Sequence, residues 1–185
     1  MSFEYLSTAP LRWRPAPPPT APKSAMKWLR RPGSLTAALS RLGPVRVEVV
    51  QESLTAKTNS AMGSAEDRQR EPVWTRDVLL LVEGVSVIAA RSVTPAAHSR
   101  CAWRAVRSLG ERPLATILYD DASVSRGRFS FASLNGSRIR RGDALSYTGC
   151  RLLARKSVFV RTTSPLLVTE VFLPELWRLV EESVC

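Results

Sequence analysis

The sequence predicts an α+β domain built on an antiparallel sheet. Three observations indicate this: segments with alternating apolar residues recur along the chain, most of them follow one another closely, and short helical segments lie outside them. Short connections suit antiparallel hairpins, whereas parallel strands need long crossovers. With 185 residues, 44% of them apolar, the chain is long enough for one domain with a core and an internal cavity.

The N-terminal segment is expected to form an extended arm. Prolines recur throughout residues 9–22, and proline lacks a backbone donor and is excluded from helix interiors and central strands. We therefore divide the chain into a proline-rich arm, residues 1–23, and a single domain, residues 24–185.

Helices are expected on both sides of the strand segments. Ser24 and Ser34 can each cap a short helix through the side-chain oxygen, and a glycine follows each helix. A longer helix has Pro95 in its first turn and Gly110 at its end. The expected helices lie, in chain order, within residues 24–31, 34–42, 94–110 and from 174 onward.

The strand segments are joined mostly by tight turns. The expected strands cover residues 45–50, 73–82, 85–93, 129–134, 137–140, 152–161 and 166–173. Gly84 and the pair Asn135-Gly136 are typical of hairpin turns, and residues 162–165 form another turn. Residues 52–70, rich in Ser, Thr, Ala and charge, are expected to be a loop.

Three of these strands carry an ionic side chain on an otherwise apolar face. Alternation places Arg76, Arg91 and Glu170 each among apolar residues that point to one side of their strand. A buried carboxylate is costly unless it is paired, hydrogen-bonded or protonated, and arginine offers a planar fork suited to carboxylates. A cavity lined by these residues would suit a small anionic organic molecule. A structural ion network, or edge positions open to water, would give the same pattern.

The net charge of +11 raises nucleic-acid binding as an alternative. However, the basic residues are spread along the chain, without a long run or the aromatic interleaving of single-strand binders. A solvated basic face is the simpler interpretation, and a diffuse positive field also helps to capture an anion. We expect no nucleic-acid partner, and nothing in the sequence indicates an oligomer, so we expect a monomer.

Metal sites and histidine-assisted nucleophiles are not indicated. The three cysteines are scattered, and His98 is the single histidine. We therefore expect neither a metal nor a cofactor. No apolar run approaches the roughly 20 residues that span a bilayer, and the N-terminus lacks the apolar core of a signal peptide. We expect a cytoplasmic protein without stable membrane insertion.

Six blocks of sequence, in the same order, resemble the chorismate lyase family. They are GSLT (33–36), WTRDVLL (74–80), ARSVTP (90–95), LGERPL (109–114), ARKS (154–157) and LLVTEVFLP (166–174). Each block alone is weakly specific, but six in family order are fairly specific. The resemblance implies a six-stranded antiparallel sheet with helices packed around it and an enclosed ligand cavity. It also implies conversion of chorismate to 4-hydroxybenzoate and pyruvate without a cofactor, at the head of ubiquinone synthesis.

The resemblance also implies roles for particular residues. Arg76 matches the arginine that binds the substrate carboxylate, Glu170 the glutamate near the ring hydroxyl, and Leu114 a backbone contact. Arg91 matches a second arginine at the cavity and its entrance, and Leu35 takes the place of a methionine in the first block. The chain departs from the family at Ala90 and Ala115, where glycine is typical, and in a longer, more basic 120–150 segment.

Two alternatives come from other functional classes. The same fold family includes effector-sensing domains of transcription regulators, which bind small molecules without turnover. Such a domain usually follows a helix-turn-helix, for which the proline-rich N-terminus leaves no room. A nucleic-acid-binding protein is the more distant alternative, because it gives the interior positions of Arg76 and Glu170 no purpose.

Overall fold

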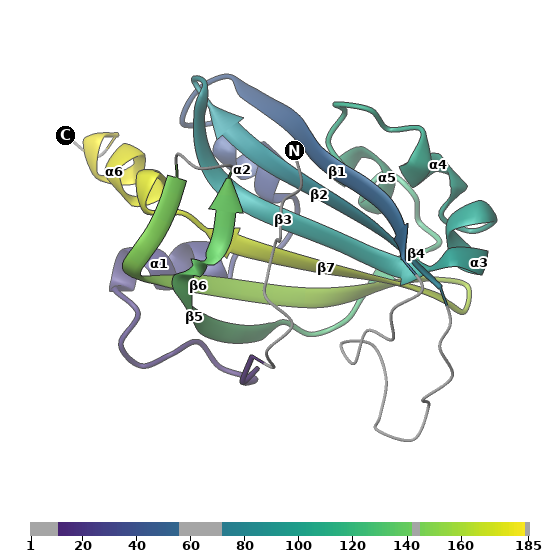
Figure 1. Cartoon of the computed structure of the whole chain (residues 1–185), viewed down its shortest axis with the longest axis horizontal. Helices are drawn as coiled ribbons and strands as arrows, with labels where there is room; N and C mark the ends of the chain where they lie inside the picture. Colours follow the sequence, from purple (N-terminus) through teal and green to yellow (C-terminus); the bar gives the residue numbers. More distant parts are fainter. Residues whose placement is uncertain (1–10, 56–71, 142–144, 184–185) are drawn as a thin grey trace.

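Seven strands of the described chain form one antiparallel sheet that crosses the molecule (Figure 1). The computed structural model describes residues 11–55, 72–141 and 145–183. The strands are β1 (Val45–Thr55), β2 (Val73–Val82), β3 (Val85–Pro95), β4 (Val124–Arg126), β5 (Ser130–Arg141), β6 (Leu145–Arg161) and β7 (Ser164–Phe172). Their spatial order is β1-β2-β3-β7-β6, with β4 and β5 both paired to β6.

β4 and β5 share one edge position of the sheet. Both pair with β6 and lie end to end, separated by residues 127–129. A hydrogen bond from the Gly127 nitrogen to the Val158 oxygen (2.8 Å) bridges this break. The sheet is therefore six strands wide, with one edge strand divided in two. The predicted α+β class is confirmed.

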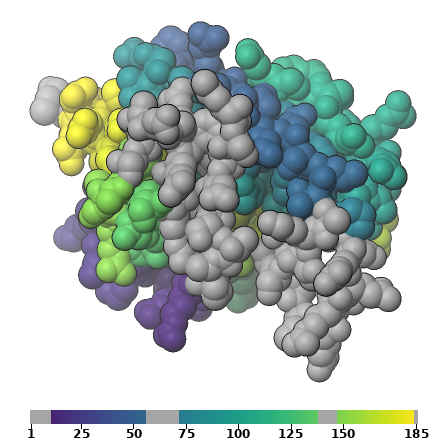
Figure 2. All heavy atoms as spheres, viewed as in Figure 1, coloured from purple at the N-terminus to yellow at the C-terminus, as the bar shows by residue number. Residues whose placement is uncertain are grey.

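The helices form two groups. They are α1 (Lys23–Leu29), α2 (Leu35–Leu39), α3 (Ala96–Arg100), α4 (Arg104–Arg107), α5 (Ala115–Leu118) and α6 (Pro174–Glu182). Buried residues of α1, α2 and α6 pack with Ile88 and Phe172 of the sheet. Residues of the α3–α5 segment pack with Phe159 and Val168, which lie toward the other end of the strands. Figure 2 shows α6 (yellow) at one end of the molecule and the teal-green α3–α5 segment at the other.

The opposite face of the sheet carries its own apolar clusters. Leu79, Ala89 and Val171 belong to one of them, and Leu11 and Trp13 from the N-terminal segment pack against it. Further along the segment, Arg14 exchanges two backbone hydrogen bonds with Phe131 (2.8 and 2.7 Å). Residues 11–14 thus lie against the sheet, and the division into arm and domain stays a prediction.

Several local predictions are confirmed. The Ser34 hydroxyl accepts a hydrogen bond from the Ala37 nitrogen (3.1 Å), as expected for the cap of α2. Glu83 and Gly84 both have positive φ, 51° and 81°, which suits the two-residue turn between β2 and β3. Pro174 begins α6, where its missing N–H leaves no helical hydrogen bond unmade.

Two predicted helices differ in detail. Ser24 is not a cap, because α1 begins at Lys23 and its capping residue is Pro22. The single helix expected over residues 94–110 is instead α3 and α4, with a break over residues 101–103. The Trp103 side chain is fully buried and its indole N–H donates to the Ser164 carbonyl (3.1 Å), so tertiary packing overrides helix propensity there.

The turn predicted at Asn135-Gly136 is wrong. Both residues lie inside β5, at a point where its register with β6 shifts. A Cβ added to Gly136 would lie 2.1 Å from the Tyr147 carbonyl oxygen, so glycine is needed there for a close backbone approach. β1 also continues to Thr55, into the predicted loop 52–70, whose remainder lies outside the described residues.

The described part of the chain contains no helix long and apolar enough to span a membrane. The cytoplasmic location, the monomeric state and the absence of a nucleic-acid partner stay predictions.

Candidate active site

Strand register places Arg76 and Glu170 on the same face of the sheet. Residues directly opposite each other in an antiparallel pair share a face. Arg76 lies opposite Ser92, and Ser92 lies opposite Val168. Val168 and Glu170 are two residues apart on β7, so their side chains also share that face. The two residues expected to contact a ligand therefore point to the same side.

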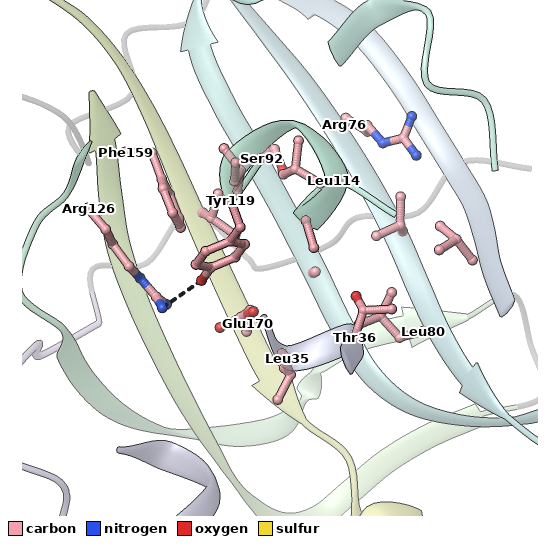
Figure 3. Close-up of a pocket in the computed structure, with 16 residues that line it drawn as sticks. Leu35, Thr36, Arg76, Leu80, Ser92, Leu114, Tyr119, Arg126, Phe159 and Glu170 are labelled. Atoms are coloured by element: carbon pink, nitrogen blue, oxygen red, sulfur yellow. Dashed lines mark hydrogen bonds between the residues drawn. The ribbon is translucent and has the colours of Figure 1, made fainter. Parts of the chain in front are cut away.

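A cavity opens on this face between the two helix groups (Figure 3). Residues of α2 and of the α5 segment line it together with strand residues. The lining residues are Leu35, Thr36, Val47, Arg76, Val78, Leu80, Ala90, Ser92, Leu114, Ala115, Leu118, Tyr119, Arg126, Phe159, Val168 and Glu170. Of the five predicted site residues, the cavity brings together Arg76, Glu170, Leu35 and Leu114.

The Arg76 guanidinium is held in place by two partners. Its side chain is 2% exposed. Nη1 donates to Glu52 Oε1 at 2.8 Å, and Nη2 donates to the Gly110 carbonyl at 2.6 Å. A guanidinium carries five N–H donors, so three remain for a ligand. Glu52 and Gly110 therefore orient a cation that still has donors to offer.

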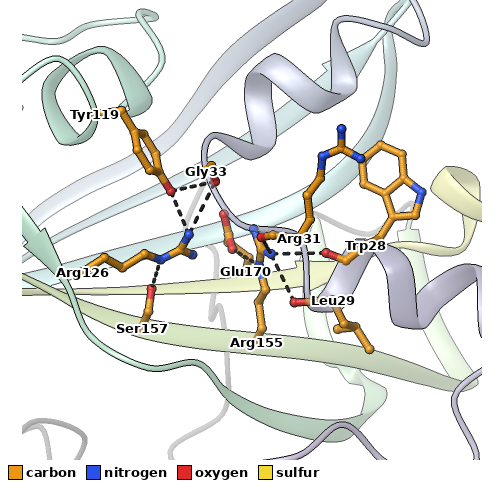
Figure 4. Close-up of polar contacts among 9 residues, drawn as sticks. All are labelled: Trp28, Leu29, Arg31, Gly33, Tyr119, Arg126, Arg155, Ser157 and Glu170. Atoms are coloured by element: carbon orange, nitrogen blue, oxygen red, sulfur yellow. Dashed lines mark hydrogen bonds and ion pairs between the residues drawn. The ribbon is translucent and has the colours of Figure 1, made fainter.

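Glu170 is tied to the end of helix α1 through Arg155 (Figure 4). Arg155 is 1% exposed, and its Nε donates to Glu170 Oε2 at 2.5 Å. Its Nη1 donates to the carbonyls of Trp28, Leu29 and Arg31, at 3.2, 3.2 and 2.9 Å. Glu170 Oε1 has no hydrogen-bond partner within the described part of the chain. That oxygen is the one available to a ligand.

Tyr119 and Arg126 form a second polar group, close to Glu170 in Figure 3. The Tyr119 hydroxyl donates to the Gly33 carbonyl (2.7 Å) and accepts from Arg126 Nη1 (2.8 Å). Arg126 Nε donates to Ser157 Oγ (3.0 Å), and the guanidinium carbon lies 3.9 Å from the centre of the Phe129 ring. The Tyr119 and Arg126 side chains are thereby fixed at one end of the cavity.

Burial shifts the pKa values of the Tyr119 phenol and the Arg126 guanidinium in opposite directions. Burial raises the pKa of the Tyr119 phenol above its ordinary value, although the charge of Arg126 opposes the shift. Burial lowers the pKa of the Arg126 guanidinium, and the nearby Tyr119 and Glu170 oppose that shift. Desolvation of Arg126 is therefore a cost that an anionic ligand would offset.

The two predicted leucines lie at the helix ends that border the cavity. Leu35 begins α2 and Leu114 precedes α5. The Leu114 N–H donates to no other residue in the ranges that the structure describes, so it can donate to a ligand. Ala90 and Ala115 also line the cavity, so the methyl groups that replace the family's glycines take up space in it.

The prediction that Arg91 lines the cavity is wrong. Arg91 lies opposite Asp77, on the other face of the sheet, and donates to both Asp77 carboxylate oxygens at 2.7 and 2.8 Å. A register shift between Leu80 and Leu81 is the cause. Next to the turn, Val82 pairs with Val85 and Leu81 with Ser86; the same register continued along both strands would place Arg91 opposite Arg76. One extra residue in a strand moves all later side chains to the other face.

Arg91→Met is expected to lower the free energy of unfolding by about 2–3 kcal/mol at neutral pH. It leaves the Asp77 carboxylate, whose side chain is 3% exposed, without its cation. Burial already raises the pKa of Asp77 above 3.8, with Arg91 opposing, so the variant's carboxylate should titrate higher still. The folded state then binds more protons than the unfolded state, and stability should fall as pH rises above about 4.

Urea unfolding between pH 4 and pH 8 measures this effect. The matched control is Asp77→Asn combined with Arg91→Met, which removes the charge but shares every other loss. The double variant should be more stable than Arg91→Met at pH 8, and the difference should shrink toward pH 4. Equal stability of the two variants at pH 8 would contradict a structural ion pair.

Sequence patterns missed Arg126, Arg155 and Tyr119 as site residues. Arg155 stands in one of the matching sequence blocks, but nothing local reveals its contact with α1, more than 120 residues away. Its position opposite Glu170 could have been found from the pairing of β6 with β7. Arg126 lies in a three-residue strand, which is too short to show alternation.

Apolar walls with a few fixed charges define the class of this site. Arginine at two places and a carboxylate acceptor between apolar walls form a cavity whose chemistry suits a small organic anion. Within residues 11–55, 72–141 and 145–183, no group of three or more His, Cys, Asp or Glu side chains could hold a metal ion.

Comparison with known proteins gives the family. The family model described as "Chorismate lyase" matches residues 11–182. The "Probable chorismate pyruvate-lyase" of Bordetella avium is 38% identical, over 96% of this chain and 91% of that protein. The "Probable chorismate pyruvate-lyase 1" of Pseudomonas entomophila is 33% identical, over 92% and 93%. The chain belongs to the chorismate lyase family, and the expectation of a lyase is confirmed.

Solved structures with the same fold include domains of bacterial regulators. The effector domain of PhnF from Mycobacterium smegmatis matches with a TM-score of 0.51 at 15% identity, over 77% of this chain and 90% of that chain. The C-terminal domain of the histidine utilization repressor from Pseudomonas syringae matches at 0.53 and 9% identity, over 71% and 93%. At these identities the likeness shows the fold alone.

Proposed function

We propose that this protein converts chorismate to 4-hydroxybenzoate and pyruvate, as the first step of the ubiquinone ring pathway. The observation that carries the proposal is the meeting of Arg76 and Glu170 in one cavity, on the face where strand register brings them together. Family membership supports the same reaction.

Each end of the cavity has a distinct task in this proposal. Arg76 binds the ring carboxylate with the donors that Glu52 and Gly110 leave unused. The Leu114 N–H adds a main-chain contact. Glu170 Oε1 accepts a hydrogen bond from the ring hydroxyl, while Oε2 remains on Arg155. The ring is thereby held at its two opposite ends.

The reaction needs one ether bond to break and one ring hydrogen to leave. The bond joins the ring to the enolpyruvyl group, and the hydrogen sits on the neighbouring carbon, which bears the hydroxyl. The electron pair of that C–H bond completes the aromatic ring. The released enolpyruvyl group keeps the ether electrons and gains one proton, giving pyruvate. A fixed conformer in a cavity with preorganised charges favours this elimination.

Product analysis tests the proposal directly. Purified protein incubated with chorismate should release 4-hydroxybenzoate and pyruvate in equal amounts, at a rate proportional to protein concentration. Binding of 4-hydroxybenzoate without turnover would instead make the protein a sensor or an inactive relative on the same fold. The absence of both turnover and binding would overturn the proposed function.

Glu52→Gln is expected to tighten 4-hydroxybenzoate binding by roughly threefold. The amide oxygen can still accept from Arg76, but the negative charge beside the ligand carboxylate is gone. Solvent screening keeps the effect small, because the Glu52 side chain is 33% exposed. Glu52→Ala removes the acceptor that orients Arg76 and should weaken binding instead.

Titration calorimetry with 4-hydroxybenzoate measures both Glu52 variants. Glu181→Gln, an exposed change on α6, controls for the altered net charge and should leave the affinity unchanged. Weaker binding in both Glu52 variants would mean that the carboxylate charge itself helps the site.

A further inference from the structure

Arg126, the second arginine of the cavity, has no carboxylate partner among the residues that the structure describes. Arg76 is paired with Glu52, and Arg155 is paired with Glu170. Arg126 lines the same cavity, and within the described part of the chain its hydrogen-bond partners are all neutral: the Ser157 and Tyr119 hydroxyls and the Gly33 carbonyl. A half-buried cation held by neutral groups leaves a positive potential in the cavity for an anion.

Arg126 also lies at the end of the cavity opposite Arg76 (Figure 3). Strand register gives the distance between the two ends. One row of residues crosses four neighbouring strands and consists of Arg76, Ser92, Val168 and Ser157. Three strand spacings amount to roughly 14 Å. Arg126 donates to Ser157 at the far end of that row. The two guanidinium groups thus stand apart, with room for a dianion between them.

The substrate of the proposed reaction is such a dianion. Its ring carboxylate stands opposite the ring hydroxyl, and the enolpyruvyl ether is attached beside the hydroxyl. With the carboxylate on Arg76 and the hydroxyl on Glu170, the enolpyruvyl group leaves the ring on the side of Glu170. Figure 3 shows Glu170 close to the Tyr119–Arg126 group and far from Arg76. Arg91 is excluded from this task by its position on the other face.

Resting on the proposed function, we propose that Arg126 binds the enolpyruvyl carboxylate of the substrate. This group is absent from 4-hydroxybenzoate, so Arg126 distinguishes substrate from aromatic product. The Tyr119 hydroxyl and Ser157 hold the guanidinium in position. Once the ether bond breaks, the anion on Arg126 belongs to the departing pyruvate and no longer to the ring.

Comparing substrate with product tests this role. Arg126→Gln keeps a donor for Ser157 or Tyr119 but removes the charge. It should raise the KM for chorismate roughly 30-fold and change the Kd for 4-hydroxybenzoate less than about threefold. Arg126→Lys should recover part of the loss in KM, because it restores the charge without the planar fork.

The matched control is Arg128→Gln, two residues along the chain and exposed to solvent. It removes the same charge from the overall field and should leave both constants unchanged. The proposal is overturned if Arg126→Gln leaves the KM unchanged, if it weakens substrate and product equally, or if Arg128→Gln raises the KM as much. Failure of the proposed function is a separate result, because the unmodified protein would then release no products.

Discussion

Arg76→Met should lower kcat/KM for chorismate roughly a thousandfold and abolish measurable binding of 4-hydroxybenzoate. Two charge-assisted hydrogen bonds to one carboxylate are worth about 4 kcal/mol together, and each 1.4 kcal/mol is a factor of ten. Substrate and product share this carboxylate, so both should be affected. That pattern separates Arg76 from Arg126, which should affect the substrate alone.

The folded structure should tolerate this change. Methionine fills much of the space of the arginine stem, and the partly exposed Glu52 can be solvated again when its partner is removed. The Gly110 carbonyl loses a donor, which costs about 1–2 kcal/mol. Thermal unfolding should therefore show a modest decrease in the melting temperature.

Arg76→Lys is the informative companion. An ammonium group keeps the charge but cannot donate two parallel hydrogen bonds to one carboxylate while also contacting Glu52 and Gly110. Its activity should lie between those of the unmodified protein and Arg76→Met. Full activity in Arg76→Lys would reduce the role of Arg76 to a point charge. Unchanged 4-hydroxybenzoate binding in Arg76→Met would mean that Arg76 does not bind the ligand.

Arg76 and Glu170 could be placed on one face from the sequence because the strands around them are uninterrupted. Side chains alternate without a break between Arg76 and Leu80 and along β7, so sequence alone assigns each residue to a face. The same argument failed for Arg91, because alternation says nothing about the register between two strands. The shift beyond Leu80 has no glycine or proline to mark it in the sequence.

The contacts that complete the site are tertiary and leave no local pattern. Arg155 lies opposite Glu170 only because β6 and β7 pair in one register. Its other partners are carbonyls at the end of α1, which reach Arg155 only because α1 packs against the sheet. Arg126 reaches the cavity through the divided edge strand, a feature that the sequence did not reveal.

Glu170→Gln and Glu170→Ala should separate ligand contact from structural support. In Glu170→Gln the amide oxygen can still accept from Arg155, but the amide nitrogen then faces the cavity as a donor. The ring hydroxyl loses its acceptor, so the Kd for 4-hydroxybenzoate should rise roughly 30-fold. Stability should fall less than in Glu170→Ala, because the amide oxygen remains as an acceptor for Arg155. A kcat equal to that of the unmodified protein would leave Glu170 an orienting role only.

Glu170→Ala should be much less stable than Glu170→Gln. It leaves the Nε–H of Arg155, a side chain that is 1% exposed, without an acceptor, whereas the glutamine oxygen can still accept there, and this loss costs about 3 kcal/mol. Urea unfolding of the two variants measures this difference. Equal stability would mean that the α1 carbonyls alone satisfy Arg155.

Glu170→Ala should also affect the helices beside the cavity. Arg155 joins Glu170 to the end of α1, and Tyr119 with Arg126 holds Gly33 just before α2. The groups proposed to contact the ligand, Glu170 and Arg126, thus also help to attach residues 23–39 to the sheet. Binding of 4-hydroxybenzoate to the unmodified protein should slow amide hydrogen exchange in that segment. Because Glu170→Ala weakens this attachment, the segment should exchange faster in the variant, and the ligand should no longer slow it. Slow exchange in the variant together with intact binding would show that neither ligand binding nor the attachment of the helices depends on Glu170.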